Sequence, residues 1–156
     1  MKIAEPNRED SIVTLRNRRA ALYLRIRNNL HTPAQNDFEL AKQQSELTSY
    51  CARKGIEIFG VFKDVGYGGY DLDRPGLQAM LRSASKKQFD VVLAVGFDRL
   101  FHNQLLLLQC AMKLEKKAIE ILQLNGSGKA ISVFEQGPVP KISLYLDMGP
   151  RRKPRP

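Results

Sequence analysis

The sequence predicts a three-layer α/β/α domain built on a mostly parallel sheet of four or five strands. Apolar runs of strand length alternate along the chain with longer stretches of helical spacing, from strand to helix and back. The strand predicted at residues 89–95 is apolar on both sides, as expected in a parallel sheet that helices cover on both faces. A chain of 156 residues is long enough for one domain with a real core. Right-handed crossovers are expected between the parallel strands.

The first predicted strand and helix lie in the first third of the chain. Residues 20–26 form an apolar run that ends in charge, and residues 28–36 are predicted to be a loop. A helix is expected from near Asp37 to about Lys54, and Gly55 is expected to end it because glycine readily adopts the left-handed conformation common at helix ends. The residues at helical spacing on one side of this helix are Leu40, Gln43, Leu47 and Tyr50.

The next strand and helix flank a glycine-rich segment. Residues 56–61 alternate in the manner of a strand, residues 64–73 are predicted to be a loop, and Pro75 suits the first turn of a helix. The loop lacks the Gly-Lys-Ser/Thr of a P-loop and the full Gly-x-Gly-x-x-Gly, so no nucleotide cofactor is expected. Its tyrosines, Tyr67 and Tyr70, either pack over the loop or stack on a partner.

The second half of the domain adds a helix and two more strands. The strand at residues 89–95 leads into Asp98-Arg99, a helix is predicted at residues 103–117, and the last clear strand occupies residues 119–124. The leucine run at residues 105–108 is wider than one buried stripe requires. It indicates either deep burial or a subunit contact.

Both ends of the chain are predicted to lie outside the folded domain, which we place at residues 19–148 with a further short strand at 139–146. Residues 1–18 are polar and charged, and we expect a flexible extension there. Residues 149–156 are rich in proline and arginine and are expected to be a disordered basic tail. No run approaches the roughly 20 apolar residues that span a membrane.

The composition favours a polyanionic partner. The net charge is +9, and the last six residues contribute Arg151, Arg152, Lys153 and Arg155 to it. Nucleic acid is the commonest partner of such a chain, and the alternative is a basic, soluble protein with charged tails. The two cysteines, Cys51 and Cys110, have no metal-ligand spacing. They predict reduced thiols on helices in a cytoplasmic protein without a metal site.

Charged residues follow several of the predicted strands. Arg25 and Arg27 are two residues apart on an extended segment and so share a face. Arg74 ends the glycine-rich loop, and Asp98 and Arg99 follow the central strand. Because parallel strands end at the same edge of a sheet, these groups are expected to converge, and a phosphodiester matches the arginine fork. A lone Asp-Arg pair at a strand end is also typical of a surface salt bridge.

Four motifs follow one another along the chain. The first is Gln-x-x-x-Leu-x-x-Tyr at residues 43–50, and the second is Asp-Val-Gly-Tyr-Gly-Gly at 64–69. The third is Asp-Arg-Pro-Gly-Leu at 73–77, and the fourth is Phe-Asp-Arg-Leu at 97–100. In this order they resemble the catalytic domain of serine recombinases of the resolvase/invertase family, and especially the large serine recombinases. The resemblance covers residues 20 to about 124.

The resemblance implies a mechanism. In the family a serine hydroxyl attacks a DNA phosphate, forms a phosphoserine link and later rejoins the strand without a required cofactor. Arginines stabilise the charge-rich transition state. By this match the phosphate clamps are Arg25, Arg74 and Arg99. Asp98 would orient an arginine or assist proton transfer, and Gln43 and Asp64 would support the site.

The chain departs from the family pattern at the position of the nucleophile. Arg27 occupies it, and a guanidinium stays protonated, so it cannot attack phosphorus. His102 stands where the family has a further arginine, and Gly68-Gly69 replaces the usual Ser-Gly. Thr32 and Ser45 are the nearby hydroxyls, and neither is a convincing substitute.

The expected function is therefore that of a recombinase-family protein, a pseudoenzyme that binds DNA phosphates but does not cut. Its basic tail, Arg151, Arg152 and Lys153, would add sequence-blind contacts. We expect a homodimer or higher oligomer, with DNA or an intact recombinase as partner. The alternative is a non-catalytic module that uses the helix with the leucines at 105–108 to dimerise with and regulate an intact recombinase. A third interpretation is a decayed gene product without activity.

Overall fold

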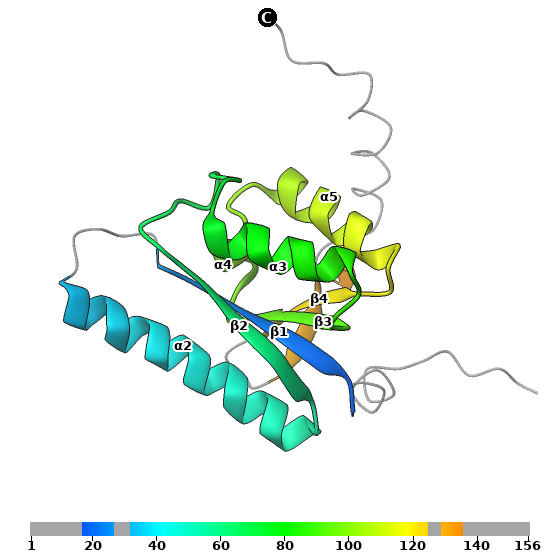
Figure 1. The fold of residues 1–156 in the computed structure, drawn as a ribbon, viewed down its shortest axis with the longest axis horizontal. Helices are drawn as coiled ribbons and strands as arrows, with labels where there is room; N and C mark the ends of the chain where they lie inside the picture. The colour runs from blue at the N-terminus through cyan, green and yellow to red at the C-terminus, as the bar shows by residue number, and fades with distance from the viewer. Residues whose placement is uncertain (1–16, 27–31, 125–128, 136–156) are drawn as a thin grey trace, which may run out of the picture.

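A five-stranded sheet forms the centre of the molecule (Figure 1). The computed structural model describes residues 17–26, 32–124 and 129–135. Along the chain the elements are β1 (Arg19–Ile26), α2 (Pro33–Lys54), β2 (Glu57–Val65), α3 (Pro75–Ser85), β3 (Val91–Ala94), α4 (Phe97–Leu100), α5 (Gln104–Glu115), β4 (Glu120–Leu124), β5 (Ala130–Ser132) and the 3-10 helix η1 (Val133–Glu135). The strand order is β2-β1-β3-β4-β5, with β5 antiparallel to β4 and the other neighbours parallel. The predicted mostly parallel sheet is confirmed.

Helices cover both faces of this sheet. α2 lies on one face, and α3, α4 and α5 lie on the other (Figure 1). On the first face, Leu47 and Tyr50 of α2 belong to one apolar cluster with Leu22 of β1. On the second face, Met80 of α3 and Ala111 of α5 belong to another cluster. The predicted three-layer arrangement is therefore also confirmed, with one core on each side of the sheet.

The strand register brings the carboxyl ends of β1, β2 and β3 to one edge. β1 pairs with β2 along its whole length, so Arg25 lies opposite Asp64. Its pairing with β3 ends earlier, at Leu22 opposite Leu93. The last residues of β1 therefore extend past β3. The backbone carbonyl of Arg99 on α4 lies within hydrogen-bonding distance of the Arg25 side chain there.

α2 begins at Pro33, so the prediction that this helix starts at Asp37 is wrong. Thr32 caps the helix: its hydroxyl accepts the N–H of Gln35 at 3.2 Å, and the Gln35 side chain accepts the N–H of Thr32 at 2.8 Å. This reciprocal capping box, followed by proline in the first turn, is a start signal that Thr-Pro-x-Gln carries in the sequence. Gly55 ends the helix with φ 71°, as predicted.

Two further boundaries differ from the predicted ones. β2 continues to Val65 because its pairing with β1 continues to the end of that strand, so Asp64 lies in the strand and not in the loop. Asp98 and Arg99 lie on the short helix α4, because β3 stops at Ala94. Gly96 precedes that helix, and its carbonyl accepts the N–H of Arg99 at 3.0 Å.

The leucine run lies on α5 and contributes to the domain's own core. Leu107 and Leu108 are buried, and Leu106 packs against the same cluster while half-buried. The sequence left two hypotheses for these leucines, deep burial and a subunit contact. Burial within the domain accounts for three of the four. Asn103 caps the helix by accepting the N–H of Leu106 at 3.1 Å.

The last strand, β5, lies where the sequence pattern predicts none. It pairs with β4, and Leu124 lies opposite Ala130. The strand predicted at residues 139–146 and most of both predicted tails fall outside the described residues. Cys51 and Cys110 are free thiols on α2 and α5, as expected. Within the described ranges, none of the helices combines the length and apolarity needed to cross a bilayer.

Candidate functional site

Three of the predicted arginines meet at the carboxyl edge of the sheet. Arg25 comes from the end of β1, Arg74 immediately precedes α3, and Arg99 lies on α4. The Nε of Arg25 donates to the backbone carbonyl of Arg99 at 2.8 Å, and Nη1 of Arg74 donates to the same oxygen at 3.2 Å. We call these three residues the arginine cluster. The side chains of Arg25 and Arg74 thus converge on the backbone of Arg99, while Arg27 lies outside the described residues.

Arg25 is buried, with 2% of its surface exposed, and its guanidinium bonds to backbone oxygens. Nη1 donates to the carbonyl of Tyr67 at 2.9 Å, and Nη2 donates to the carbonyl of Asp98 at 2.6 Å. Nη2 also lies 3.2 Å from Nε2 of His102. Burial, together with the neighbouring Arg74 charge, holds the pKa of Arg25 below its usual value. The oxygens that bond directly to this buried cation are backbone carbonyls.

Arg74 is fully buried and uses its donors in the same way. Nε donates to the carbonyl of Asp71 at 2.7 Å, and Nη2 donates to the carbonyl of Leu100. Its guanidinium carbon also lies 5.3 Å from the ring centroid of Phe101, within the range of a cation–π contact. Arg74 thereby ties the end of the glycine-rich loop to α4.

A tyrosine hydroxyl links Arg74 to Asp64. The Tyr23 hydroxyl donates to the Asp64 carboxylate at 2.6 Å and accepts from Nη1 of Arg74 at 3.0 Å. The same carboxylate accepts the backbone N–H groups of Gly76 and Leu77 at 2.7 and 2.9 Å, which caps α3. Burial, reinforced by the bond to Asp64, raises the pKa of Tyr23 well above its usual range. The hydroxyl therefore stays protonated.

Tyr23 is the site residue that sequence reasoning missed. It lies within the apolar run of β1 and was counted only as part of a buried strand. The available signal was a phenol in a fully buried strand, which needs a hydrogen-bond partner. That partner is Asp64, the predicted supporting residue.

Gln43, the other predicted supporting residue, holds the backbone of Arg25. Its side-chain amide lies 3.3 Å from the N–H of Arg25 as acceptor and 3.2 Å from the carbonyl as donor. Gln43 is itself buried on α2. Gln43 thus bonds to the backbone N–H and the carbonyl of Arg25 where β1 no longer pairs with β3. These bonds fix the backbone that carries the guanidinium.

Arg99 is the accessible member of the arginine cluster, and Asp98 is its exposed partner. Nη1 of Arg99 lies 3.2 Å from the Asp98 carboxylate, with 33% and 56% of the two side chains exposed. The Nε of Arg99 is buried and has no hydrogen-bond partner among the described residues. Arg99 therefore differs from Arg25 and Arg74, whose donors point to protein oxygens.

Comparison with known proteins identifies the family of the chain. The family model described as "Resolvase, N terminal domain" matches residues 20–137. The chain belongs to this family. Its fold is therefore that of a resolvase-family, serine recombinase catalytic domain.

Solved structures show the same fold. One is the N-terminal catalytic domain of TP901-1 integrase, with a TM-score of 0.68 and 23% identity over 85% of this chain and 97% of that one. Another is a resolvase family site-specific recombinase from Streptococcus pneumoniae, with a TM-score of 0.64 and 16% identity over 86% and 89%. A third is the C-terminal catalytic domain of ISC1926 TnpA, an IS607-like serine recombinase, with a TM-score of 0.59 and 25% identity over 66% and 67%.

In this resolvase-family domain His102 packs closely against the glycine-rich loop. Its backbone N–H donates to the carbonyl of Gly69 at 3.3 Å, and its ring stacks on Tyr70 with 5.7 Å between centroids. A Cβ at Gly69 would lie 2.3 Å from Cδ2 of the imidazole, so only glycine permits this approach. At Gly68 a Cβ would meet nothing within 4 Å, so the serine usual in the family would fit there.

The remaining predicted site residues lie outside the described residues. These are Arg27 at the nucleophile position and the basic tail residues Arg151, Arg152 and Lys153. Their roles stay predictions.

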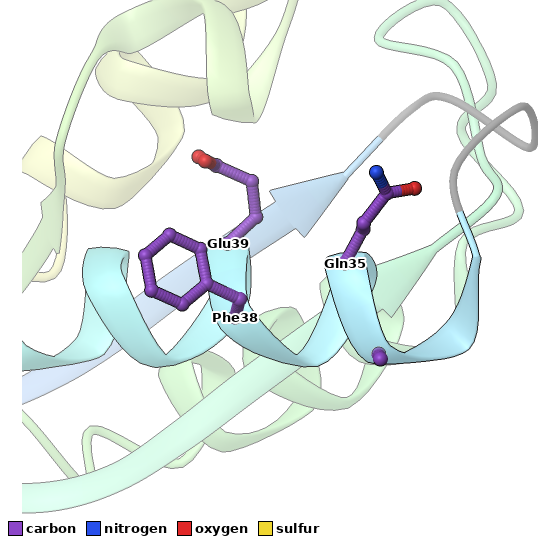
Figure 2. A pocket seen from close by; sticks show the side chains of 4 residues that line it. Gln35, Phe38 and Glu39 are labelled. Atoms are coloured by element: carbon purple, nitrogen blue, oxygen red, sulfur yellow. The ribbon is translucent and has the colours of Figure 1, made fainter.

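One pocket of about 410 Å³ lies at the start of α2 (Figure 2). Ala34, Gln35, Phe38 and Glu39 line it, and none of them belongs to the arginine cluster. Phe38 is 70% exposed. With a single carboxylate and one amide, this pocket lacks the convergent polar groups of a specific ligand site.

Proposed function

We propose that this serine recombinase domain binds DNA phosphates without cleaving the strand. The observation that supports the proposal is a difference in exposure and bonding among the three arginines of the cluster. Arg25 and Arg74 are buried on backbone oxygens, whereas Arg99 retains 33% side-chain exposure. A phosphate can reach Arg99 in this arrangement. Arg25 and Arg74 would reach it only if the glycine-rich loop and α4 moved apart.

The absence of cleavage rests on the chemistry of the available groups. Arg27 offers no nucleophile, because a guanidinium remains protonated. The Tyr23 hydroxyl is buried, donates its proton to Asp64 in a hydrogen bond, and accepts one from Arg74. Thr32 uses its hydroxyl to cap α2, and Ser45 is an exposed residue on the same helix. None of these described hydroxyls is placed against the exposed guanidinium.

Covalent capture tests the loss of cleavage. The full chain incubated with a pool of nicked duplexes is expected to give no protein–DNA adduct on a denaturing gel, because the phosphoserine link cannot form. Arg27→Ser alone is expected to remain inactive on this pool, because His102 stands where the family has a further arginine to stabilise the transition state. A family member with its serine, on its own nicked site, is the positive control. An adduct of the unaltered chain that mass spectrometry maps to a hydroxyl would contradict the proposal.

Arg99→Ala tests phosphate binding. Binding to duplex DNA is expected to weaken about 10-fold at low salt, and the slope of log K against log salt should fall by about one. Arg99→Lys should recover the slope but only part of the affinity, because a lysine lacks the guanidinium fork. The measurement is fluorescence anisotropy at several salt concentrations.

Lys42→Ala is the matched control for Arg99→Ala. Lys42 is exposed on α2, and its replacement removes the same charge from the other layer of the molecule. It should change binding less than threefold, as expected of long-range electrostatics alone. Equal losses for the two variants would show that net charge, and not the cluster, binds DNA.

The alternative of a regulatory interaction module stays a prediction. The α5 leucines on which it depended pack largely into the domain's own core.

A further inference from the structure

Tyr70 exposes a large aromatic ring beside the arginine cluster. It is 66% exposed in the loop between β2 and α3, and it belongs to neither apolar core. One face of its ring stacks on His102, with an angle of 29° between the two planes. The sequence left two hypotheses for Tyr70, packing over the loop and stacking on a partner. Packing over the loop does not explain why most of the side chain is exposed.

His102 is held firmly in this stack. Nη2 of the buried Arg25 lies 3.2 Å from its Nε2, which therefore acts as acceptor, since a guanidinium can only donate. The N–H of His102 bonds to Gly69, and the missing Cβ of that glycine makes room for the imidazole. Because Tyr70 is already supported, it loses less conformational entropy when a ligand covers its other face.

An exposed cation belongs to the same site. The side chain of Arg25 contacts both the backbone carbonyl of Arg99, at 2.8 Å, and the ring of His102, at 3.2 Å. The guanidinium of Arg99 is the accessible one of the arginine cluster. Proteins that hold single-stranded nucleic acid combine a backbone-binding cation with aromatic rings on which bases stack. In a duplex each base is already covered by its neighbours, so such a platform suits an unpaired nucleotide.

We infer that Tyr70, supported by His102, stacks on the base of an unpaired DNA nucleotide whose phosphate binds at Arg99. This inference rests on the proposed function, because it assigns the partner of the same phosphate site. It adds a preference for single-stranded DNA that phosphate binding alone does not produce.

The test compares labelled single strands with and without bases. The full chain is titrated by fluorescence anisotropy with a thymidine oligonucleotide and with an abasic strand of equal length and charge. The intact strand is expected to bind about 10-fold more tightly, which matches the lower part of the range for one stacked base. Tyr70→Ala should remove this preference, whereas Tyr70→Phe should keep it because the ring remains.

Leu72→Ala is the matched control, because Leu72 is an exposed apolar residue of the same loop, 46% accessible. It should keep the preference for the intact strand. Equal affinity of the unaltered chain for the two strands, or a preference that survives in Tyr70→Ala, would overturn the inference. So would a change of oligomeric state in Tyr70→Ala with the base preference intact, since the ring would then be a protein contact.

The same titrations separate the two proposals. Salt-dependent binding to both strands without a base preference would overturn this inference and leave phosphate binding standing. No binding to either strand or to duplex DNA would overturn both.

Discussion

Replacing Arg74 with alanine is expected to lower the free energy of unfolding by about 3–5 kcal/mol, an effect typical of breaking a buried charged network. The side chain is fully buried. Its loss would leave the carbonyls of Asp71 and Leu100 without their donor, open a cavity beside Phe101, and deprive the Tyr23 hydroxyl of a partner. Urea unfolding followed by circular dichroism measures the change.

Arg82→Ala is the control for this substitution. Arg82 lies exposed on α3, the helix that Arg74 precedes, and the same truncation there should stay within about 0.5 kcal/mol. A loss below about 1 kcal/mol for Arg74→Ala would mean that the loop and α4 do not depend on its bonds. The buried guanidinium would then be better explained as a phosphate ligand that a small movement releases.

Replacing Gly76 with alanine is expected to destabilise the domain by about 2–3 kcal/mol, even though alanine favours helix formation by about 1 kcal/mol over glycine. A Cβ there would lie 2.4 Å from the carbonyl oxygen of Lys63 and 2.9 Å from the Asp64 carboxylate. The first obstacle is backbone of β2 and cannot rotate away. The substitution would push α3 off the carboxylate that caps it.

Gly68→Ala is the control for Gly76→Ala. Position 68 has space for a Cβ, and the substitution should be neutral or stabilising by about 0.4–1 kcal/mol through the unfolded state. Thermal unfolding of both variants makes the comparison. If the two melt alike, the close approach of α3 to β2 is not rigid.

Both predictions concern residues inside a motif that the sequence already singled out. Asp-Arg-Pro-Gly-Leu at residues 73–77 suggested family membership and a phosphate clamp. The structure adds a structural role: the arginine binds backbone carbonyls of the loop and α4, and the glycine allows α3 to approach β2. These two residues of the motif therefore stabilise the fold, whatever their part in chemistry.

The local sequence pattern predicts the order and type of the helices and strands. Where a strand ends depends on the strand that pairs with it. The alternation of strands and helices follows from apolar periodicity, which is a local property. The end of β2 depends on how far β1 continues beside it, so the local pattern predicts a loop at Asp64 where the structure has a strand. The start of α2 was missed for a different reason, since its signal in Thr32 and Gln35 is local.

The sequence by itself determined the family and which charged side chains would gather, because parallel strands end at a common edge and the motifs follow them. Only the tertiary structure decided what those side chains bind. The donors of Arg25 and Arg74 meet backbone carbonyls, whose directions depend on the turns of the loop and of α4. Backbone acceptors have no residue type to mark them in a sequence. Arg99 is thus the exposed member of the cluster because of how the chain folds around it.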